Sequence, residues 1–219
     1  MERKALIFDV DGTLSDSRAT IIRAWDEVLD SLPYRHTELT MEFMNGHLGR
    51  NMDQWSMDTL PDLPLEESRK IINDCMQHEN EMLYKIGASI YPDVRATFEK
   101  LKDRYLLYIL SNCGCGYIEA ISHLANVEDL IAGHLCFGDT GLDKPENIAL
   151  LLRQEELKEA AYIGDMDGDR QSSEKAGVGF IYASYGFGHV NHPRYAIQKM
   201  SELPEVADRL FADWEKQSL

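Results

Sequence analysis

Two aspartates separated by one residue follow the first apolar segment of the chain. That segment covers residues 5–8, and the sequence continues as Asp9-Val10-Asp11-Gly12-Thr13. Two carboxylates at this spacing can divide their work between a nucleophile and a general acid or base. Gly12 allows a sharp turn whose backbone N–H groups can face a phosphate. An acidic turn after a strand is common in proteins and need not have a catalytic role. This motif therefore indicates a function only in combination with the other polar motifs of the chain.

Two further polar pairs occur later in the chain. Ser111 and Asn112 follow the apolar segment 105–110, where a hydroxyl and an amide can donate hydrogen bonds to phosphate oxygens. Ser-Asn pairs also make ordinary turns and helix caps. Lys144 and Pro145 precede a segment with helical spacing, and proline suits the first helical position. That arrangement holds the lysine in place to neutralise a phosphate, although a solvated surface lysine is the default interpretation.

Three aspartates follow the apolar segment 160–163, in the motif Gly164-Asp165-Met166-Asp167-Gly168-Asp169. Proteins hold Mg²⁺ with a few carboxylates together with water and substrate phosphate. Asp165 and Asp169 can act together, one on the metal and the other as its support. The same spacing begins a calcium-binding EF-hand loop, which needs Gly and Glu where this sequence has Arg170 and Ala176. The motif therefore favours magnesium.

Predicted strands and predicted helices alternate along the part of the chain that carries these motifs. Short, continuous apolar runs are typical of strands buried on both faces of a parallel sheet, and they lie at residues 5–8, 105–110, 135–137, 160–163 and 179–183. Helical stripes separate them. The alternation predicts a doubly wound, Rossmann-like α/β core with right-handed crossovers. Because the polar motifs follow strands, they are expected to meet at one edge of the sheet.

Residues 15–87 break the alternation, because they carry helical stripes and no convincing strand. One stripe runs from Ile21 to Leu32 and another from Ile71 to Ile86, with a polar gap at Glu79. We predict a small helical cap domain at 15–87, inserted into an α/β core formed by residues 1–14 and 88–219. A glycine-bearing stretch at 46–50 can reach the core site, where Arg50 can bind a substrate anion; a solvated arginine is an equal alternative.

The composition narrows the class of protein. The 219 residues carry a formal net charge of −16, which disfavours binding to nucleic acid or to anionic membranes. The chain has no apolar run near the roughly 20 residues of a membrane helix and no signal-like start, so we expect a cytoplasmic protein, a monomer or simple homodimer. Cys113 and Cys115 match neither a redox pair nor a zinc knuckle, and we interpret them as small residues in a turn.

Taken in order, the motifs resemble the haloacid dehalogenase superfamily of phosphohydrolases. The similarity covers essentially the whole chain, and the stretches at 176–178 and 185–188 resemble its phosphoglycolate-phosphatase-like branch, which carries a small helical cap. The resemblance implies a Mg²⁺-dependent phosphatase. Its substrate would be the phosphomonoester of a small metabolite, hydrolysed through an aspartyl-phosphate.

The resemblance also implies a role for each matching residue. Asp9 would attack phosphorus and bind Mg²⁺, with Asp165 as the second side-chain ligand. Asp11 would protonate the leaving oxygen, then activate water, and its backbone carbonyl would bind the metal. Asp169 would orient Lys144 or a metal-bound water. The phosphoryl oxygens would be held by Thr13, Ser111 and Lys144.

Other activities of the same fold remain to be weighed. Asp11 argues against C–halogen and C–P cleavage, because those branches lack an aspartate at this position. A sugar phosphomutase of the β-phosphoglucomutase type would keep Asp9, Asp11, Lys144 and Asp165, and it stays as the alternative, although Thr13 favours hydrolysis. A non-catalytic binding module is less favoured, because every expected catalytic position is occupied.

Overall fold

The central sheet is parallel throughout. The computed structural model describes residues 4–50 and 52–217, and within that range six strands pair in the order β5-β4-β1-β6-β7-β8. Their bounds are β1 (Lys4–Phe8), β4 (Leu106–Ser111), β5 (Gly133–Cys136), β6 (Glu159–Gly164), β7 (Gly179–Ala183) and β8 (Ala196–Ile197). The doubly wound α/β fold is confirmed. The prediction about a targeting segment falls on residues 1–3, outside the described range.

The strand at the centre, β1, explains why the sheet is covered on both faces. Leu6 and Phe8 point into one hydrophobic core, while Ala5 and Ile7 point into the other. All of them are fully buried, so the run of apolar residues has no polar face. The covering helices are α5 (Val94–Leu101), α6 (Tyr117–Leu124), α7 (Phe137–Thr140), α8 (Lys144–Gln154), α9 (Asp167–Ala176) and α10 (Leu203–Gln217).

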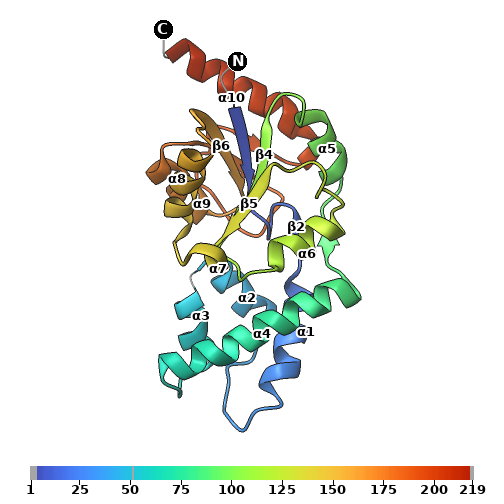
Figure 1. Ribbon diagram of the computed structural model, residues 1–219, viewed down its shortest axis with the longest axis vertical. Helices are drawn as coiled ribbons and strands as arrows, with labels where there is room; N and C mark the ends of the chain where they lie inside the picture. Colours follow the sequence, from blue (N-terminus) through green and yellow to red (C-terminus); the bar gives the residue numbers. More distant parts are fainter. Residues whose placement is uncertain (1–3, 51, 218–219) are drawn as a thin grey trace.

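The inserted segment forms a separate helical layer beyond the carboxyl ends of the strands (Figure 1). It comprises α1 (Arg18–Leu29), α2 (Met41–His47), α3 (Met52–Thr59) and α4 (Leu65–Ile86). The predicted apolar stripes form its interior, because Trp25 and Leu29 of α1 are buried together with Ile72 and Leu83 of α4. The layer therefore covers the edge of the sheet at which the strands end and the polar motifs lie.

Several strand boundaries differ from the sequence-based expectation. A two-residue strand, β2 (Ser15–Asp16), pairs antiparallel with β3 (Ser89–Ile90), where the chain enters and leaves the helical layer. The expectation of no strand from residue 15 was therefore wrong at its first two residues. β5 begins and ends earlier than predicted, since Phe137 already starts α7. Strands of two residues are too short to show an alternating pattern.

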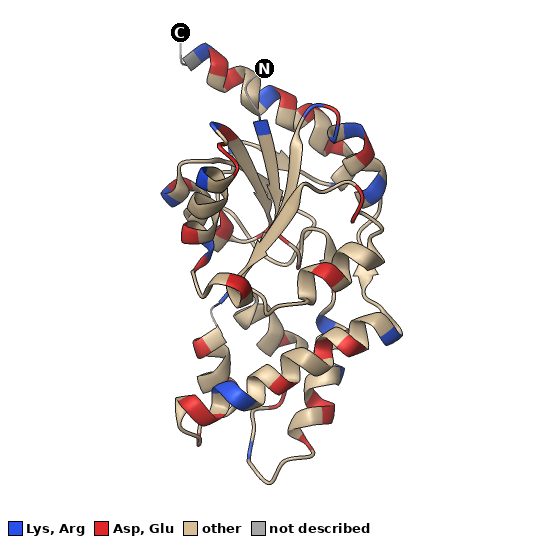
Figure 2. Ribbon diagram, viewed as in Figure 1, with Lys and Arg blue, Asp and Glu red and all other residues tan. Residues whose placement is uncertain are grey.

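Acidic residues outnumber basic ones, and the two signs are mixed along the helices in one view of the molecule (Figure 2). The sequence has 38 acidic residues against 22 Lys and Arg, and Figure 2 shows both signs interspersed along the outer helices, with few charges on the sheet. Among the described residues, every helix is too short or too polar to cross a bilayer.

The contact between β1 and α5 supplies a test of the core. Phe8 and Phe98 are fully buried, with ring centroids 4.4 Å apart. We expect Phe98→Ala to lower the free energy of unfolding by about 3–5 kcal/mol, because the cavity it leaves lies in the packed interior. Urea denaturation measures the change. The control is Tyr84→Ala, whose ring is 56% exposed; equal losses in both variants would contradict this description of the core.

Candidate active site

The predicted polar motifs meet where three neighbouring strands end. Asp9 directly follows β1, Ser111 is the last residue of β4, and Asp165 directly follows β6. Because β1 pairs with both β4 and β6, with Phe8 beside Ile109 and Ile163, these ends are adjacent. The carboxyl edge of an open α/β sheet is where such folds build their sites.

Lys144 lies between two buried carboxylates. Its Nζ is 3.0 Å from Asp9 Oδ1 and 2.6 Å from Asp169 Oδ1, and all three side chains are at most 8% exposed. Burial opposes the charge of the lysine, but the Asp169 and Asp9 carboxylates outweigh it and hold the pKa of Lys144 well above its ordinary value. Tyr162 Oη also donates to Asp9 Oδ1, at 3.2 Å. These contacts orient the Asp9 carboxylate.

Asp165 completes an acidic cluster with one unused oxygen. Ligand atoms of Asp9, Asp165 and Asp169 lie within 4.8 Å of one another. Asp165 Oδ2 accepts hydrogen bonds from the backbone N–H groups of Phe187 (2.7 Å) and Gly188 (3.2 Å), while Oδ1 is buried with no partner among the described residues. Burial raises the pKa of Asp165 to about 7. A divalent cation would satisfy the unpaired oxygen, and the all-oxygen donor set fits a hard ion.

Two glycines permit the close packing around Asp165. A Cβ on Gly186 would lie 2.3 Å from Asp165 Cβ and 2.4 Å from the carbonyl oxygen of Gly12. A Cβ on Gly12, whose φ is +80°, would lie 2.2 Å from Asp165 Oδ2. The loop after β7 therefore presses against both acidic motifs, which is a role that the sequence alone did not assign to it.

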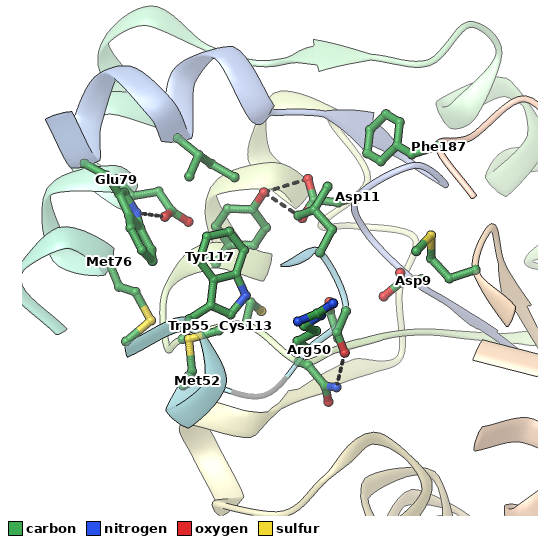
Figure 3. Close-up of a pocket in the computed structure, with 18 residues that line it drawn as sticks. Asp9, Asp11, Arg50, Met52, Trp55, Met76, Glu79, Cys113, Tyr117 and Phe187 are labelled. Carbon is green, nitrogen blue, oxygen red and sulfur yellow. Dashed lines mark hydrogen bonds between the residues drawn. The ribbon is translucent and has the colours of Figure 1, made fainter. Parts of the chain in front are cut away.

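Asp11 is held by hydrogen bonds from Tyr117 and Ser17. Tyr117 Oη donates to both of its carboxylate oxygens, at 2.8 and 2.9 Å (Figure 3). Ser17 Oγ also donates to Asp11. Desolvation raises the pKa of Asp11 to about 6, and these hydrogen bonds partly offset it. A carboxyl group with a pKa close to neutral suits a general acid. Neither Tyr117 nor Ser17 had a predicted catalytic role.

The remaining predicted residues occupy distinct places. Thr13 is fully buried, and its Oγ1 has no partner in the described part of the chain. Ser111 and Asn112 line a pocket beside Asp9, and Asn112 Nδ2 donates to the Gly49 carbonyl at 3.0 Å. Arg50 lines the same pocket from the helical layer, half exposed, with Nη1 3.7 Å from an Asp58 oxygen. The structure thus brings core and inserted residues to one cavity.

That cavity, of about 60 Å³, lies between the sheet edge and the inserted helices. Figure 3 shows Asp9 and Asp11 on one side of it and Glu79 of α4 on the other. The helical layer also contributes aromatic and sulfur-containing side chains, namely Trp25, Met52, Trp55 and Met76. The predicted apolar stripes contain Trp25 and Met76, whereas Met52 and Trp55 had no predicted role.

Among the pocket residues from the helical layer, Glu79 has the clearest signal in the sequence. The polar gap in the stripe of α4 marks a carboxyl group that is 6% exposed, with Oε2 accepting from Trp25 Nε1 at 2.5 Å. Burial raises the pKa of Glu79 to about 8. Buried acids without a cationic partner are costly, so such a gap is informative.

Replacing Gly186 tests the close packing around Asp165. We expect Gly186→Ala to lower the free energy of unfolding by about 1–3 kcal/mol, because the new methyl group overlaps Asp165 and Gly12. Guanidinium denaturation measures it. Gly168→Ala is the matched control, since a Cβ there meets nothing within 4 Å. A Gly186→Ala protein as stable as wild type would contradict the packing.

The buried Glu79 predicts a particular pH dependence of stability. Its carboxyl ionises near 4.5 in an unfolded chain and near 8 in the folded one. Between those pH values the folded chain binds more protons, so raising the pH favours unfolding by up to about 1 kcal/mol per unit. We expect wild type to lose stability relative to Glu79→Gln from pH 5 to 8, measured by urea denaturation. Parallel profiles of the two proteins would show that Glu79 is solvated.

Comparison with known proteins agrees with the fold and with the motifs. The family model described as haloacid dehalogenase-like hydrolase matches residues 6–183. The chain is 26% identical over 217 residues to the phosphoglycolate phosphatase of Aquifex aeolicus (strain VF5), covering 94% of this chain and 97% of that protein. It is 27% identical over 199 residues to that of Aliivibrio fischeri (strain ATCC 700601 / ES114), covering 85% and 86%.

A solved structure adds the same architecture. The crystal structure of a predicted phosphoglycolate phosphatase from Haemophilus somnus 129PT matches with a TM-score of 0.81 at 19% identity, covering 94% of this chain and 99% of that one. The resemblance recognised in the sequence motifs is thereby confirmed. The chain belongs to the haloacid dehalogenase-like hydrolase family of enzymes.

Proposed function

We propose that the chain is a Mg²⁺-dependent phosphatase that hydrolyses the phosphomonoester of a small metabolite through an aspartyl-phosphate on Asp9. The observation that carries the proposal is the environment of Asp9. Its carboxylate lies beside the Lys144 ammonium at 3.0 Å and within 4.8 Å of Asp165, and it faces the pocket that also contains Asp11. The relatives of the chain that are named phosphoglycolate phosphatase support the same reaction class.

The proposed metal ligands are the side chains of Asp9 and Asp165 and the backbone carbonyl of Asp11. The unpaired Asp165 Oδ1 and the hard oxygen donors support this assignment. Mg²⁺ bound there would neutralise charge on the transferring phosphoryl group. Asp169 is occupied by Lys144 and by the backbone N–H of Met166, so its proposed role is to position the lysine.

The proposed reaction has two displacements. In the first, Asp9 attacks phosphorus, the bond to the alcohol oxygen breaks, and Asp11 gives its proton to that oxygen. In the second, Asp11 takes a proton from water, whose oxygen attacks the aspartyl-phosphate and releases inorganic phosphate. Thr13, Ser111 and Lys144 bind the phosphoryl oxygens, and fixed charge in a water-poor site stabilises the transition state.

We further propose that residues 15–87 are a cap on the core formed by 1–14 and 88–219, whose ends at 1–3 and 218–219 lie outside the described residues. Contacts across the divide support this, since Asn112 donates to Gly49 and Asn80 Nδ2 donates to the Cys115 carbonyl at 2.8 Å. Motion about Ser15 and Gly87 would admit substrate. Cys75, Cys113, Cys115 and Cys136 are free thiols, which fits the cytoplasm that we propose as its compartment.

Replacing Asp9 tests the nucleophile. We expect wild type to release phosphate from p-nitrophenyl phosphate only with Mg²⁺, and Asp9→Asn to be more than about 10³-fold slower, because an amide cannot form the intermediate. The matched control is Asp167→Asn, from the same acidic motif but half-exposed and bonded to Arg170; its rate should stay within about twofold. Turnover by Asp9→Asn, or by wild type in EDTA, would refute the mechanism.

The phosphomutase alternative is tested on the same protein. Incubation with sugar phosphates, followed by measurement of free phosphate and of isomeric sugar phosphate, separates the two reactions. We expect free phosphate, because Thr13 favours hydrolysis. Accumulation of an isomer without phosphate release would select the mutase.

A further inference from the structure

The hydrolytic steps do not use Glu79, although it lines the pocket opposite Asp9 and Asp11. We propose that Glu79, together with the rings of Trp25 and Trp55, binds a cationic amine on the leaving group. The substrate would then be the phosphate ester of a small amino alcohol. This inference rests on the phosphatase function proposed above and specifies its substrate class.

The position of Glu79 is difficult to explain by packing alone. It stands on the buried face of α4, between Cys75 and Leu83, both fully buried. Within the described chain its carboxylate receives a hydrogen bond only from Trp25 Nε1, and it forms an ion pair with none of the Lys or Arg side chains. A buried carboxylate with one neutral donor lacks the partner that would compensate its charge.

The aromatic neighbours of Glu79 provide the second half of an ammonium site. Trp25 and Trp55 have ring centroids 5.0 Å apart and planes inclined at 58°, and both rings line the same cavity. Tyr117 lines it as well, between Glu79 and Asp11 in the view of Figure 3. The face of an aromatic ring attracts a cation, and a carboxylate beside such rings favours a cation over a neutral group.

The charges around the cavity point in the same direction. Of the described lining residues, Asp9, Asp11 and Glu79 are acidic, and Arg50 is the cation, half exposed and near Asp58. An anionic leaving group, such as the glycolate for which the relatives are named, would approach Glu79 with like charge. A nearby cation instead stabilises the ionised form of Glu79, whose pKa burial raises to about 8.

The size of the cavity limits the leaving group. Its volume of about 60 Å³ is about twice the roughly 30 Å³ that one water molecule occupies in the liquid. A leaving group of only a few heavy atoms therefore fits between Asp11 and Glu79. Ethanolamine is a leaving group of this kind and carries the required charge, and choline is a larger cation of the same class.

The test compares three classes of phosphomonoester on the wild-type enzyme with Mg²⁺. The cationic substrates are phosphoethanolamine and phosphocholine, the neutral one is propyl phosphate, and the anionic one is phosphoglycolate. We expect kcat/KM for a cationic ester to exceed that of propyl phosphate by about tenfold or more, with phosphoglycolate lowest. Equal values for cationic and neutral esters, or a preference for phosphoglycolate, would overturn the inference.

A generic substrate separates this inference from the proposed function. If p-nitrophenyl phosphate is hydrolysed but amines confer no preference, the ammonium site alone is wrong. If no phosphomonoester is hydrolysed, the phosphatase proposal itself fails.

Variants test whether Glu79 and Trp55 cause the preference for cationic esters. Glu79→Gln keeps the shape of the side chain and removes its charge, so the ratio of cationic to neutral kcat/KM should fall to about one, chiefly through KM. Glu81→Gln, an exposed change on the same helix, should leave the ratio unaltered. Trp55→Leu, which keeps an apolar side chain, should lower the ratio about threefold or more and provides the test if Glu79→Gln fails to fold. An unchanged ratio in the folded variants would refute the site.

Discussion

The excess of buried carboxylates over ammonium groups where β1 and β6 end governs the whole site. Asp9, Asp165 and Asp169 are each at most 5% exposed, and Lys144 is the cation that touches the first and third of them. Such an imbalance is costly in a low-dielectric interior. Backbone N–H groups of the loop after β7 offset part of it, and one oxygen of Asp165 stays unpaired. A divalent cation and the charge distribution of phosphoryl transfer complement this arrangement.

The core and the inserted helices contribute different chemistry to one pocket. The core places Asp9 and Asp11 at strand ends whose register is set by a sheet buried on both faces. The helices α1, α3 and α4 contribute rings, sulfur atoms and Glu79. Tyr117 of α6 connects the two, because its hydroxyl holds Asp11 while its ring lines the cavity. The pocket therefore combines strand-end carboxylates of the core with side chains of the inserted helices.

Family membership is informative about the contribution of the core and much less about that of the inserted helices. Relatives at 26–27% identity share nearly the full length of the chain, and the solved structure at 19% identity shares the fold. Glu79, the buried acid that we propose to bind the leaving group, lies in the inserted helices. It is outside the four motifs by which the family was recognised. Substrate class in this chain accordingly has to be argued from the pocket itself.

The sequence by itself determined the buried strands, the order of the polar motifs and the helical nature of the insert, because those features leave local patterns of period and turn chemistry. Short strands such as β2 and β8 left none. Only the tertiary structure decided that Glu79 faces Asp11 across a cavity, that Tyr162 donates to Asp9, and that Cys136 lies beside Cys115. A helical stripe reports that a face is buried but carries no information about what it is buried against, since that partner comes from a distant part of the chain.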